Sequence, residues 1–326
     1  MRIAIVGAGI SGLSCADALI GHDHEIVLFD KGRGPGGRMS TRRVDVQGRT
    51  LRFDHGAQYF TARDPAFVAQ VLRWESDGVA ARWPDAGPDA WVGTPGMNTP
   101  AKAVAAAHAV AWETRVDGLE REGEMWRLAG TPEAGSFDAV VVAVPAEQAG
   151  PLLQPFQASF AQLAGRTPSA PCWTAMVAFA EPVRTEQRVI RGAGPIGWVA
   201  RDGAKPARNN AETWLVQASP DWSSEHLEAS PQEIAPKLLR LLEAALAVPL
   251  PPPVHLSAHR WRYARSGPAG GPGALWDDPI RLGACGDWLL APRVEAAWLS
   301  GRRLATLMNT GQGCASLASR RSAHTC

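Results

Sequence analysis

Residues 2–30 read RIAIVGAGISGLSCADALIGHDHEIVLFD, and this stretch decides the fold. A short β-branched run is followed by Gly7, Gly9 and Gly12 in the spacing G-x-G-x-x-G. Apolar residues then recur at helical spacing as far as Gly21, and a second apolar run ends at Asp30. A strand, a glycine-rich turn, a helix and a second strand in this order predict a βαβ unit that binds a dinucleotide.

Each glycine of this motif has a separate task. Gly7 makes the tight turn, Gly9 lets the backbone approach a diphosphate, and Gly12 lets the helix pack against the strand. The phosphates then meet free N–H groups at the positive end of the helix. Asp30 is placed to accept hydrogen bonds from ribose hydroxyls and to repel a 2′-phosphate, which favours FAD or NAD over NADP. A glycine-rich turn that binds nothing is the alternative.

Residues 30–43, DKGRGPGGRMSTRR, follow directly and are too glycine-rich and basic to build a core. A plain NAD-binding domain usually has a helix here. We expect the loop to form a second clamp on the same diphosphate, with Arg38 as the contacting residue. Arg42 and Arg43 are expected to be solvated.

The order of strand, GxGxxG, acid and GxxGGR resembles the FAD-binding domain of the flavin amine oxidase superfamily. Further stretches resemble the renalase family, especially its bacterial members: residues 30–43 with FDHGAQYFTARDPAF (53–67), WVARDGAKPAR (198–208), ETWLVQASPDWSSEHLE (212–228) and HRWRYA (259–264). The resemblance spans nearly the whole chain. It implies an α/β, two-domain FAD-dependent oxidoreductase of the p-hydroxybenzoate hydroxylase or amine oxidase type, with a Rossmann-type FAD domain and an inserted mixed-sheet substrate domain.

The pattern along the chain predicts the following elements. Helices are expected over 66–77, 100–110, 152–164, 231–247 and 291–308. A strand pair is expected around 80–92, a hairpin over 111–130 with alternation around 121–124, and strands over 137–145, 172–180, 196–200, 212–219, 254–264 and 280–290. The FAD domain is expected to be discontinuous, with residues 1–66, 94–149 and 279–309. The substrate domain takes 67–93 and 150–278, and 310–326 is expected to be a disordered tail.

Composition excludes several classes. A chain of 326 residues suits two domains, and a net charge of +1 gives no field that would attract nucleic acid or a membrane. The five cysteines are scattered, which suits neither a disulfide framework nor a zinc site, so no metal is expected. No apolar run is long enough to span a membrane. We therefore expect a soluble, cytoplasmic protein.

The expected site residues fall into two groups. The candidates for cofactor binding are Gly7, Gly9, Ile10, Ser11, Gly12, Asp30, Lys31, Gly37, Arg38, Met39, His55, Gly56, Ala57, Gln58, Val116, Gly286, Asp287 and Val294. The candidates for catalytic residues are Gln58, Tyr59, Trp198, His259, Trp261 and Tyr263. Alternation in HRWRYA puts His259, Trp261 and Tyr263 on one strand face.

Simpler roles stay open for several of these residues. Buried tryptophan and tyrosine are usually core residues, and His55 is as well explained by packing. Asp287 is expected near the ribityl chain by resemblance, and a helix N-cap is its other role. Arg201 and Arg208 are expected either to meet substrate phosphates or, more simply, to be solvated.

The renalase resemblance implies an activity. Renalases oxidise 2- and 6-dihydro isomers of NAD(P)H to NAD(P)⁺, pass hydride to the flavin N5 and electrons to O₂, and so produce H₂O₂. FAD is expected to be noncovalent, with the dinucleotide substrate and O₂ as partners. A flavin amine oxidase acting on a small amine is the alternative, although only Tyr59 and Tyr263 are tyrosines and Lys205 falls in a polar loop. A non-catalytic dinucleotide-binding protein is a third reading.

Overall fold

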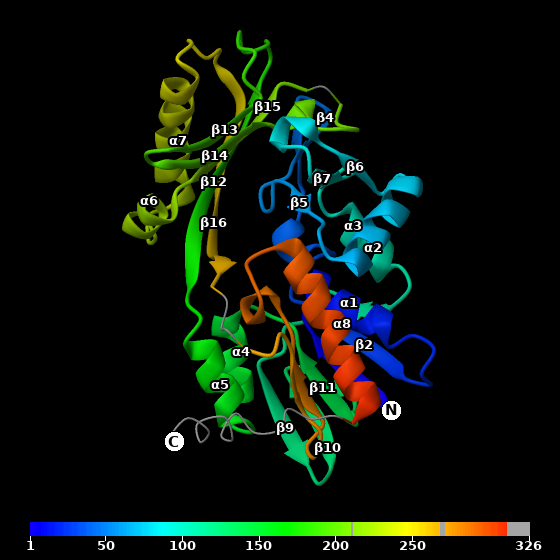
Figure 1. The fold of residues 1–326 in the computed structure, drawn as a ribbon. Coiled ribbons are helices and arrows are strands. Elements are labelled where there is room, and N and C mark those ends of the chain that lie inside the picture. Colours follow the sequence, from blue (N-terminus) through cyan, green and yellow to red (C-terminus); the bar gives the residue numbers. More distant parts are fainter. Residues whose placement is uncertain (210, 268–270, 312–326) are drawn as a thin grey trace, which may run out of the picture.

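The computed structural model describes residues 1–209, 211–267 and 271–311 of the chain. Two large sheets lie at opposite ends of an elongated molecule (Figure 1). One contains the first strand of the chain, and the other is built mainly from the second half of the sequence.

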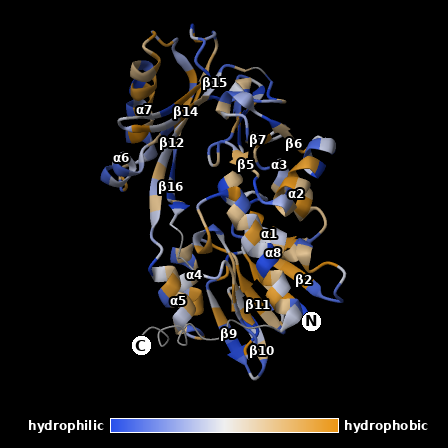
Figure 2. Cartoon of the chain, viewed as in Figure 1, coloured by the Kyte–Doolittle hydropathy of each residue, from blue (hydrophilic) through white to orange (hydrophobic). Residues whose placement is uncertain are grey.

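The first sheet has six strands in the order β17-β18-β11-β1-β2-β8. They are β1 (Arg2–Val6), β2 (Glu25–Phe29), β8 (Ala109–Ala111), β11 (Ala139–Val142), β17 (Leu275–Asp277) and β18 (Leu282–Ala284). All neighbouring pairs are parallel except β17 with β18. The β11 sequence AVVV is buried throughout, as expected of a parallel strand covered on both faces, and Figure 2 shows it in hydrophobic colours.

Both faces of this sheet are covered. One face packs on α1 (Ile10–Ala18), α3 (Thr99–Ala105) and α8 (Val294–Thr310). The other packs on the hairpin of β9 (Gly118–Glu122) and β10 (Met125–Ala129) and on α4 (Ala146–Leu153) and α5 (Ala158–Gly165). The carboxyl ends of β1, β2, β11 and β18 therefore meet at one edge, where α/β sheets bind their ligands.

The second sheet has five antiparallel strands in the order β13-β14-β15-β12-β16. They are β12 (Ser169–Phe179), β13 (Val189–Ala193), β14 (Ile196–Arg201), β15 (Thr213–Ala218) and β16 (Pro253–Ser266). Its outer face packs on α7 (Pro231–Leu246), which buries Ile234, Leu238 and Leu242 one turn apart, with α6 (Pro220–Glu225) beside it. The opposite face meets residues 53–60, which are described below.

A smaller unit lies beside these sheets. It contains α2 (Pro65–Ser76) and a three-stranded sheet of β5 (Phe60–Thr61), β7 (Ala90–Gly93) and β6 (Ala80–Arg82). A hairpin of β3 (Arg42–Val46) and β4 (Arg49–Phe53) leads into it. Short 3₁₀ turns occur at η1 (Gly37–Met39), η2 (Pro84–Ala86), η3 (Pro132–Ala134), η4 (Asp202–Ala204) and η5 (Asp287–Leu289).

Most predicted elements are confirmed, and three need correction. The helix expected over 100–110 ends at Ala105, and Ala109–Ala111 forms strand β8. The helix expected over 152–164 is two helices, because Pro155 removes a backbone donor between them. The strand expected over 280–290 is only Leu282–Ala284. The hairpin β3–β4 and strand β13 were not predicted.

The assignment of residue ranges to an FAD domain and a substrate domain stays a prediction. Residues 312–326 of the expected tail lie outside the described residues. In the part of the chain that the structure describes, no helix combines the length and the apolar character needed to cross a membrane.

Candidate active site

The glycine-rich turn leaves space for a ligand at one glycine only. A Cβ on Gly7, whose φ is +108°, would lie 2.6 Å from the Ala143 carbonyl oxygen, and a Cβ on Gly12 would lie 2.0 Å from the Gly7 oxygen. Packing therefore requires both of these glycines. A Cβ on Gly9 would meet no heavy atom within 4 Å. Gly9 keeps open a space beside the start of α1 that the protein itself does not fill.

The donors around this space suit a diphosphate. Gly9 is the N-cap of α1, no side chain caps the helix, and its first turn holds no acid, so its first N–H groups are available. The Asp30 carboxylate accepts from the backbone N–H of Ala8 at 2.8 Å and of Gly32 at 2.7 Å. A Cβ on Gly37 would lie 3.6 Å from the Gly9 Cα, so the second glycine-rich loop lies against the first. These residues fit a dinucleotide cofactor.

Arg38 and Asp287 form an ion pair at the same edge of the sheet. The two guanidinium nitrogens of Arg38 lie 2.9 and 2.6 Å from the two Asp287 oxygens, which is bidentate geometry. Asp287 is 5% exposed and directly follows Gly286, whose N–H donates to Ser300 at 2.9 Å. The N-cap of α8 is Arg293, so Asp287 does not cap that helix. Arg38 and Asp287, which are both predicted cofactor-binding residues, are thus joined by an ion pair.

The other candidates for cofactor binding have mixed settings. Ser11 is buried, and its hydroxyl donates to the Cys285 sulfur at 3.1 Å. Lys31 is exposed, with its Nζ 3.4 Å from Gln148 Oε1. Ile10 and Met39 are buried, and Val116 and Val294 are half-buried. Ala57 is half-buried, and its backbone N–H donates to the Arg38 carbonyl at 2.8 Å.

Five residues form one row across the inner face of the five-stranded sheet. The strand registers pair Arg191 with Trp198, Trp198 with Gln217, Gln217 with Thr174, and Thr174 with His259. Residues directly opposite each other in paired strands project to the same face. The sheet therefore presents Arg191, Trp198, Gln217, Thr174 and His259 side by side.

The segment 55–59 runs along this row. The His55 ring lies 5.0 Å from the His259 ring, the Gly56 carbonyl accepts from the Gln217 amide at 2.7 Å, and the Tyr59 ring lies 5.3 Å from the Trp198 ring. A Cβ on Gly56 would lie 2.0 Å from the Arg38 carbonyl oxygen, so the segment also touches the cofactor-clamp loop. The structure thus brings two of the predicted site residues of the sheet, Trp198 and His259, against the 55–59 segment.

At one end of the row, three rings form a cluster. The Trp261 ring lies 5.1 Å from His55 and 4.7 Å from His259, and its Nε1 donates to the His55 carbonyl at 2.8 Å. Burial and the charges of His259 and Arg42 lower the pKa of His55 to about 3, and burial and Arg42 lower the pKa of His259 to about 4. Both imidazoles are therefore neutral at pH 7. Nδ1 of His55 is buried without a hydrogen-bond partner.

At the other end, Arg191 covers the aromatic pair. Its guanidinium carbon lies 5.6 Å from the centre of the Tyr59 ring and 4.8 Å from that of Trp198, and its Nη1 donates to the Tyr59 hydroxyl at 3.2 Å. Trp198 Nε1 is buried without a hydrogen-bond partner. Tyr263 lies two residues beyond Trp261 on β16, and no ring contact among the described residues joins it to either cluster.

Gln58 is held by the protein on both sides of its amide. Its Nε2 donates to the carbonyls of Asp54 at 2.5 Å and Gly56 at 3.1 Å, and its Oε1 accepts from Lys205 Nζ at 3.3 Å. Gln58 is 5% exposed. These contacts fix the orientation of the amide, and they give Gln58 a role in holding the 54–58 segment.

Lys205 is buried, which corrects the expectation of a polar loop. Its ammonium lies 2.7 Å from Asp202 and 3.3 Å from Asp54, and all three side chains are 0–1% exposed. Arg208 completes the cluster through a short contact with Asp54. Burial opposes ionisation of Asp54, yet the charges of Lys205 and Arg208 lower its pKa well below the usual range. Two anions and two cations therefore neutralise one another beneath the 54–58 segment.

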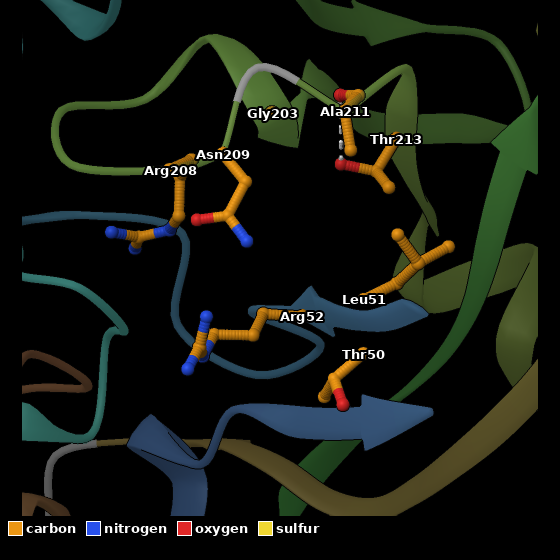
Figure 3. Close-up of a pocket in the computed structure, with 8 residues that line it drawn as sticks. All are labelled: Thr50, Leu51, Arg52, Gly203, Arg208, Asn209, Ala211 and Thr213. Atoms are coloured by element: carbon orange, nitrogen blue, oxygen red, sulfur yellow. Dashed lines mark hydrogen bonds between the residues drawn. The ribbon is translucent and has the colours of Figure 1, made fainter. Parts of the chain in front are cut away.

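The two arginines expected either to be solvated or to meet substrate phosphates are not solvated, since both pair with carboxylates. Arg201 pairs with Glu212, and Arg208 pairs with Asp54. A small pocket lies beside Arg208, between β4 and the segment after η4 (Figure 3). It is lined by Thr50, Leu51, Arg52, Gly203, Arg208, Asn209, Ala211 and Thr213, so it does not include the aromatic row.

Comparison with known proteins identifies the family. Residues 5–73 match the model of an NAD(P)-binding Rossmann-like domain, and residues 82–309 match that of the flavin containing amine oxidoreductases. The chain belongs to the flavin containing amine oxidoreductase family. Membership implies a flavin cofactor, FAD, which agrees with the open space at Gly9 and its donors.

Solved structures of a putrescine oxidase and a cyclohexylamine oxidase share the fold. A putrescine oxidase triple mutant aligns over 95% of this chain and 99% of its own, with a TM-score of 0.68 and 14% identity. Cyclohexylamine oxidase from Brevibacterium oxydans aligns over 95% and 99%, with a TM-score of 0.60 and 15% identity. These likenesses confirm the predicted α/β two-domain fold.

Similarity to curated relatives is short. An L-amino acid oxidase of Cerastes cerastes is 49% identical over 47 residues, which are 14% of this chain and 9% of the relative. A 4,4'-diapophytoene desaturase of Staphylococcus aureus is 40% identical over 45 residues, also 14% and 9%. The chain thus spans about a tenth of the length of these relatives.

Replacing Asp30 or Asp287 with alanine should lower the flavin content of the purified protein. Asp30 organises two backbone donors of the glycine-rich turn, and Asp287 holds Arg38. Losing either charge-assisted set costs about 1.5–3 kcal/mol, or roughly 10- to 100-fold in FAD affinity. The ratio of flavin to protein absorbance measures this. Full flavin content in both variants would mean that the cofactor lies elsewhere.

Three members of the row were missed by sequence reasoning: Arg191, Gln217 and Thr174. On β15 the same-face neighbours of Gln217 are Thr213 and Leu215, and on β12 those of Thr174 are Cys172 and Met176. Strand β13 contains neither tryptophan nor histidine, so period-2 alternation carried no signal for any of the three. Their alignment depends on strand register, which the sequence does not reveal. Asp202 and Lys205 were missed as partners because Asp54 lies about 150 residues away in the chain.

Proposed function

We propose that this protein is a flavin-dependent oxidase of the renalase type. It takes hydride from 2- or 6-dihydro isomers of NAD(P)H and delivers the electrons to O₂. One dihydronicotinamide, one O₂ and one proton give one NAD(P)⁺ and one H₂O₂. FAD is held without a covalent bond, and the partners are the dinucleotide substrate and O₂.

The observation that carries this proposal is the neutral ring cluster between arginines. His55, His259 and Trp261 offer flat, uncharged faces, since the pKa values of both histidines are far below 7. Arg42 reaches His259 at one end of the row, and Arg191 covers Tyr59 and Trp198 at the other. Such a surface suits a flat pyridine ring that carries phosphates and disfavours a cationic ligand.

The chain's own residues bind and orient the substrate. FAD, when bound, supplies the hydride acceptor and the route of electrons to O₂. In this proposal Trp261 stacks on the pyridine ring and His259, whose ring stands at 80° to that of Trp261, contacts the edge of the pyridine. The Gln217–Gly56 hydrogen bond holds the 55–59 segment against the sheet. The substrate becomes aromatic as hydride leaves, so the site needs no strong base. Neutral histidines are consistent with this requirement.

A flavin amine oxidase acting on a small amine is the second candidate. Family membership and the shared fold of amine oxidases support it as well. Burial of Lys205 also removes one argument against it, because the lysine lies 3.3 Å from Gln58, one of the predicted catalytic residues. Against it stands the guanidinium of Arg191, which lies over the Tyr59 and Trp198 rings that an amine would need.

Oxygen uptake distinguishes the two candidates. NAD⁺ reduced with borohydride gives a mixture of dihydro isomers, and the 2- and 6-dihydro forms should be consumed with one H₂O₂ and one NAD⁺ formed for each O₂. Putrescine and cyclohexylamine serve as the amine arm. Peroxide formed from an amine, with none from the isomers, would contradict the proposal.

Replacing His259 with alanine should slow flavin reduction and leave FAD bound. The variant removes a ring that contacts both His55 and Trp261. The pyridine ring of the substrate is then oriented less well in the site. A contact between rings is worth about 0.5–1.5 kcal/mol, and misorientation adds to it, so a 10- to 100-fold slower reduction is expected. Anaerobic stopped-flow absorbance measures the rate. Unchanged kinetics would show that His259 only packs.

A further inference from the structure

Two histidines of the ring cluster, His55 and His259, belong with three further basic side chains to a group in which the structure records no ion pair with a carboxylate among the described residues. Arg42 lies at the start of β3, and its Nη2 is 3.5 Å from His259 Nδ1. We call Arg33, Arg42, His55, His255 and His259 the Arg42 cluster. Its side chains come from the loop before η1, from β3, from the 54–58 segment and from β16.

Within the cluster, the charge of Arg42 favours the neutral form of the histidines. Burial and the charge of Arg33 lower the pKa of Arg42. Arg42 in turn contributes to the lowered pKa of His55, His255 and His259, after burial in each case. The charges of Arg33 and Arg42, which are both exposed, therefore concentrate positive potential beside the three histidines.

The carboxylates of Asp54 and Asp287 form ion pairs with cations outside the Arg42 cluster. Asp54 adjoins His55 in sequence, but its charge is matched by Lys205 and Arg208, and Asp287 is paired with Arg38. Among the described residues, no ion pair involves Arg33 or Arg42. The buried Nδ1 of His55, on a side chain 4% exposed, also has no hydrogen-bond partner in this neighbourhood. The cluster thus offers cationic and polar groups without a counter-charge.

We propose that the Arg42 cluster binds an anionic phosphoryl group of the substrate, with Arg42 as its principal contact. This inference rests on the proposed function, because a dihydronicotinamide dinucleotide carries phosphates next to its ribose. Trp261 and His259 hold the flat ring, and Arg42 holds the phosphate beside it. A guanidinium binds phosphate through two N–H groups, so Arg42 sets the preference for nucleotides over nucleosides.

The test compares ligands on the FAD-loaded protein without turnover. Oxidised nicotinamide mononucleotide carries one phosphate, nicotinamide riboside carries none, and inorganic phosphate is the free anion. Titration calorimetry should show the mononucleotide binding at least tenfold tighter than the riboside, with inorganic phosphate competing. In Arg42→Gln the tenfold preference should disappear, and in Arg42→Lys it should partly return.

Arg49→Gln is the matched control. Arg49 lies on the same hairpin, at the opposite end from Arg42, and is exposed. It should keep the wild-type preference. Equal preference in wild type and Arg42→Gln would overturn the proposal. Loss of FAD from Arg42→Gln would overturn it too, because the anion would then belong to the cofactor.

Failure of the proposed anion site can be distinguished from failure of the proposed function. Mononucleotide binding that depends on Arg42, in a protein that does not oxidise the dihydro isomers, would support the anion site and reject the renalase activity. If the protein oxidises the dihydro isomers but Arg42→Gln keeps the preference for the mononucleotide over the riboside, the activity is supported and the anion site is rejected.

Discussion

Lys205→Met should lower the free energy of unfolding by about 3–5 kcal/mol, because it leaves a buried carboxylate without its cation. The ammonium lies 2.7 Å from Asp202 and 3.3 Å from Asp54, and none of the three side chains is exposed by more than 1%. Methionine fills a similar volume, so the loss reflects charge and not a cavity. Urea unfolding of the FAD-free protein measures it.

Two variants control this prediction. Arg127→Gln removes one partner of the exposed Arg127–Glu122 pair, so it should cost no more than about 1 kcal/mol. The double variant Lys205→Met with Asp202→Asn restores charge balance between Asp54 and Arg208 and should recover part of the stability. A Lys205→Met loss no larger than that of Arg127→Gln would show that the cluster is hydrated.

The loss of stability caused by Lys205→Met should depend on pH, and the pKa of Asp202 sets the direction. Burial and the charge of Asp54 raise the pKa of Asp202, and Lys205 acts to lower it. Without Lys205 the folded pKa of Asp202 rises further above its unfolded value. A raised pKa contributes stability that is present below the unfolded pKa and is lost as the pH rises through the folded pKa. The penalty of Lys205→Met should therefore shrink as the solution is made acidic.

Gly9→Ala should abolish most FAD binding while leaving the fold intact. The backbone of Gly9 has φ −73° and ψ 176°, which alanine adopts freely, and the added Cβ meets no protein atom within 4 Å. It does enter the space where a diphosphate meets the start of α1. We expect about a 100-fold loss of FAD affinity, or roughly 2.7 kcal/mol. Flavin titration of the apoprotein measures it.

Variants of two other glycines distinguish a loss of FAD affinity from a loss of folding stability. Gly12→Ala places a Cβ 2.0 Å from the Gly7 oxygen, so it should destabilise the apoprotein itself by about 1–3 kcal/mol. Gly165→Ala, at the end of α5, also meets nothing within 4 Å, so it should leave flavin binding unchanged and should not lower stability. Wild-type FAD affinity in Gly9→Ala would show that the space at Gly9 is not used by the cofactor.

The sequence predicted what depends on local signals. The βαβ unit followed from three glycines, two apolar runs and Asp30 within thirty residues, and the structure confirms that unit. The same reasoning put His259 and Trp261 on one strand face, where their rings are 4.7 Å apart. Period and turn chemistry are properties of neighbouring residues, so a single sequence carries them.

What the sequence could not predict depends on distant partners. RDGAKPAR is polar, and its composition suggests solvent, yet Lys205 is neutralised by Asp54 from a segment about 150 residues earlier. The row from Arg191 to His259 depends on the registers of five strands. Register and long-range charge pairing are set by tertiary packing, which local pattern does not encode.

The measurement that tests the central claim most directly is the anaerobic half-reaction of the FAD-loaded protein. The purified protein is mixed without oxygen with 2- or 6-dihydro-NAD, and the visible flavin band is followed. Rapid bleaching that reverses when air is admitted is the predicted result. A band that persists with both isomers but bleaches with putrescine or cyclohexylamine would contradict the account and make the protein an amine oxidase.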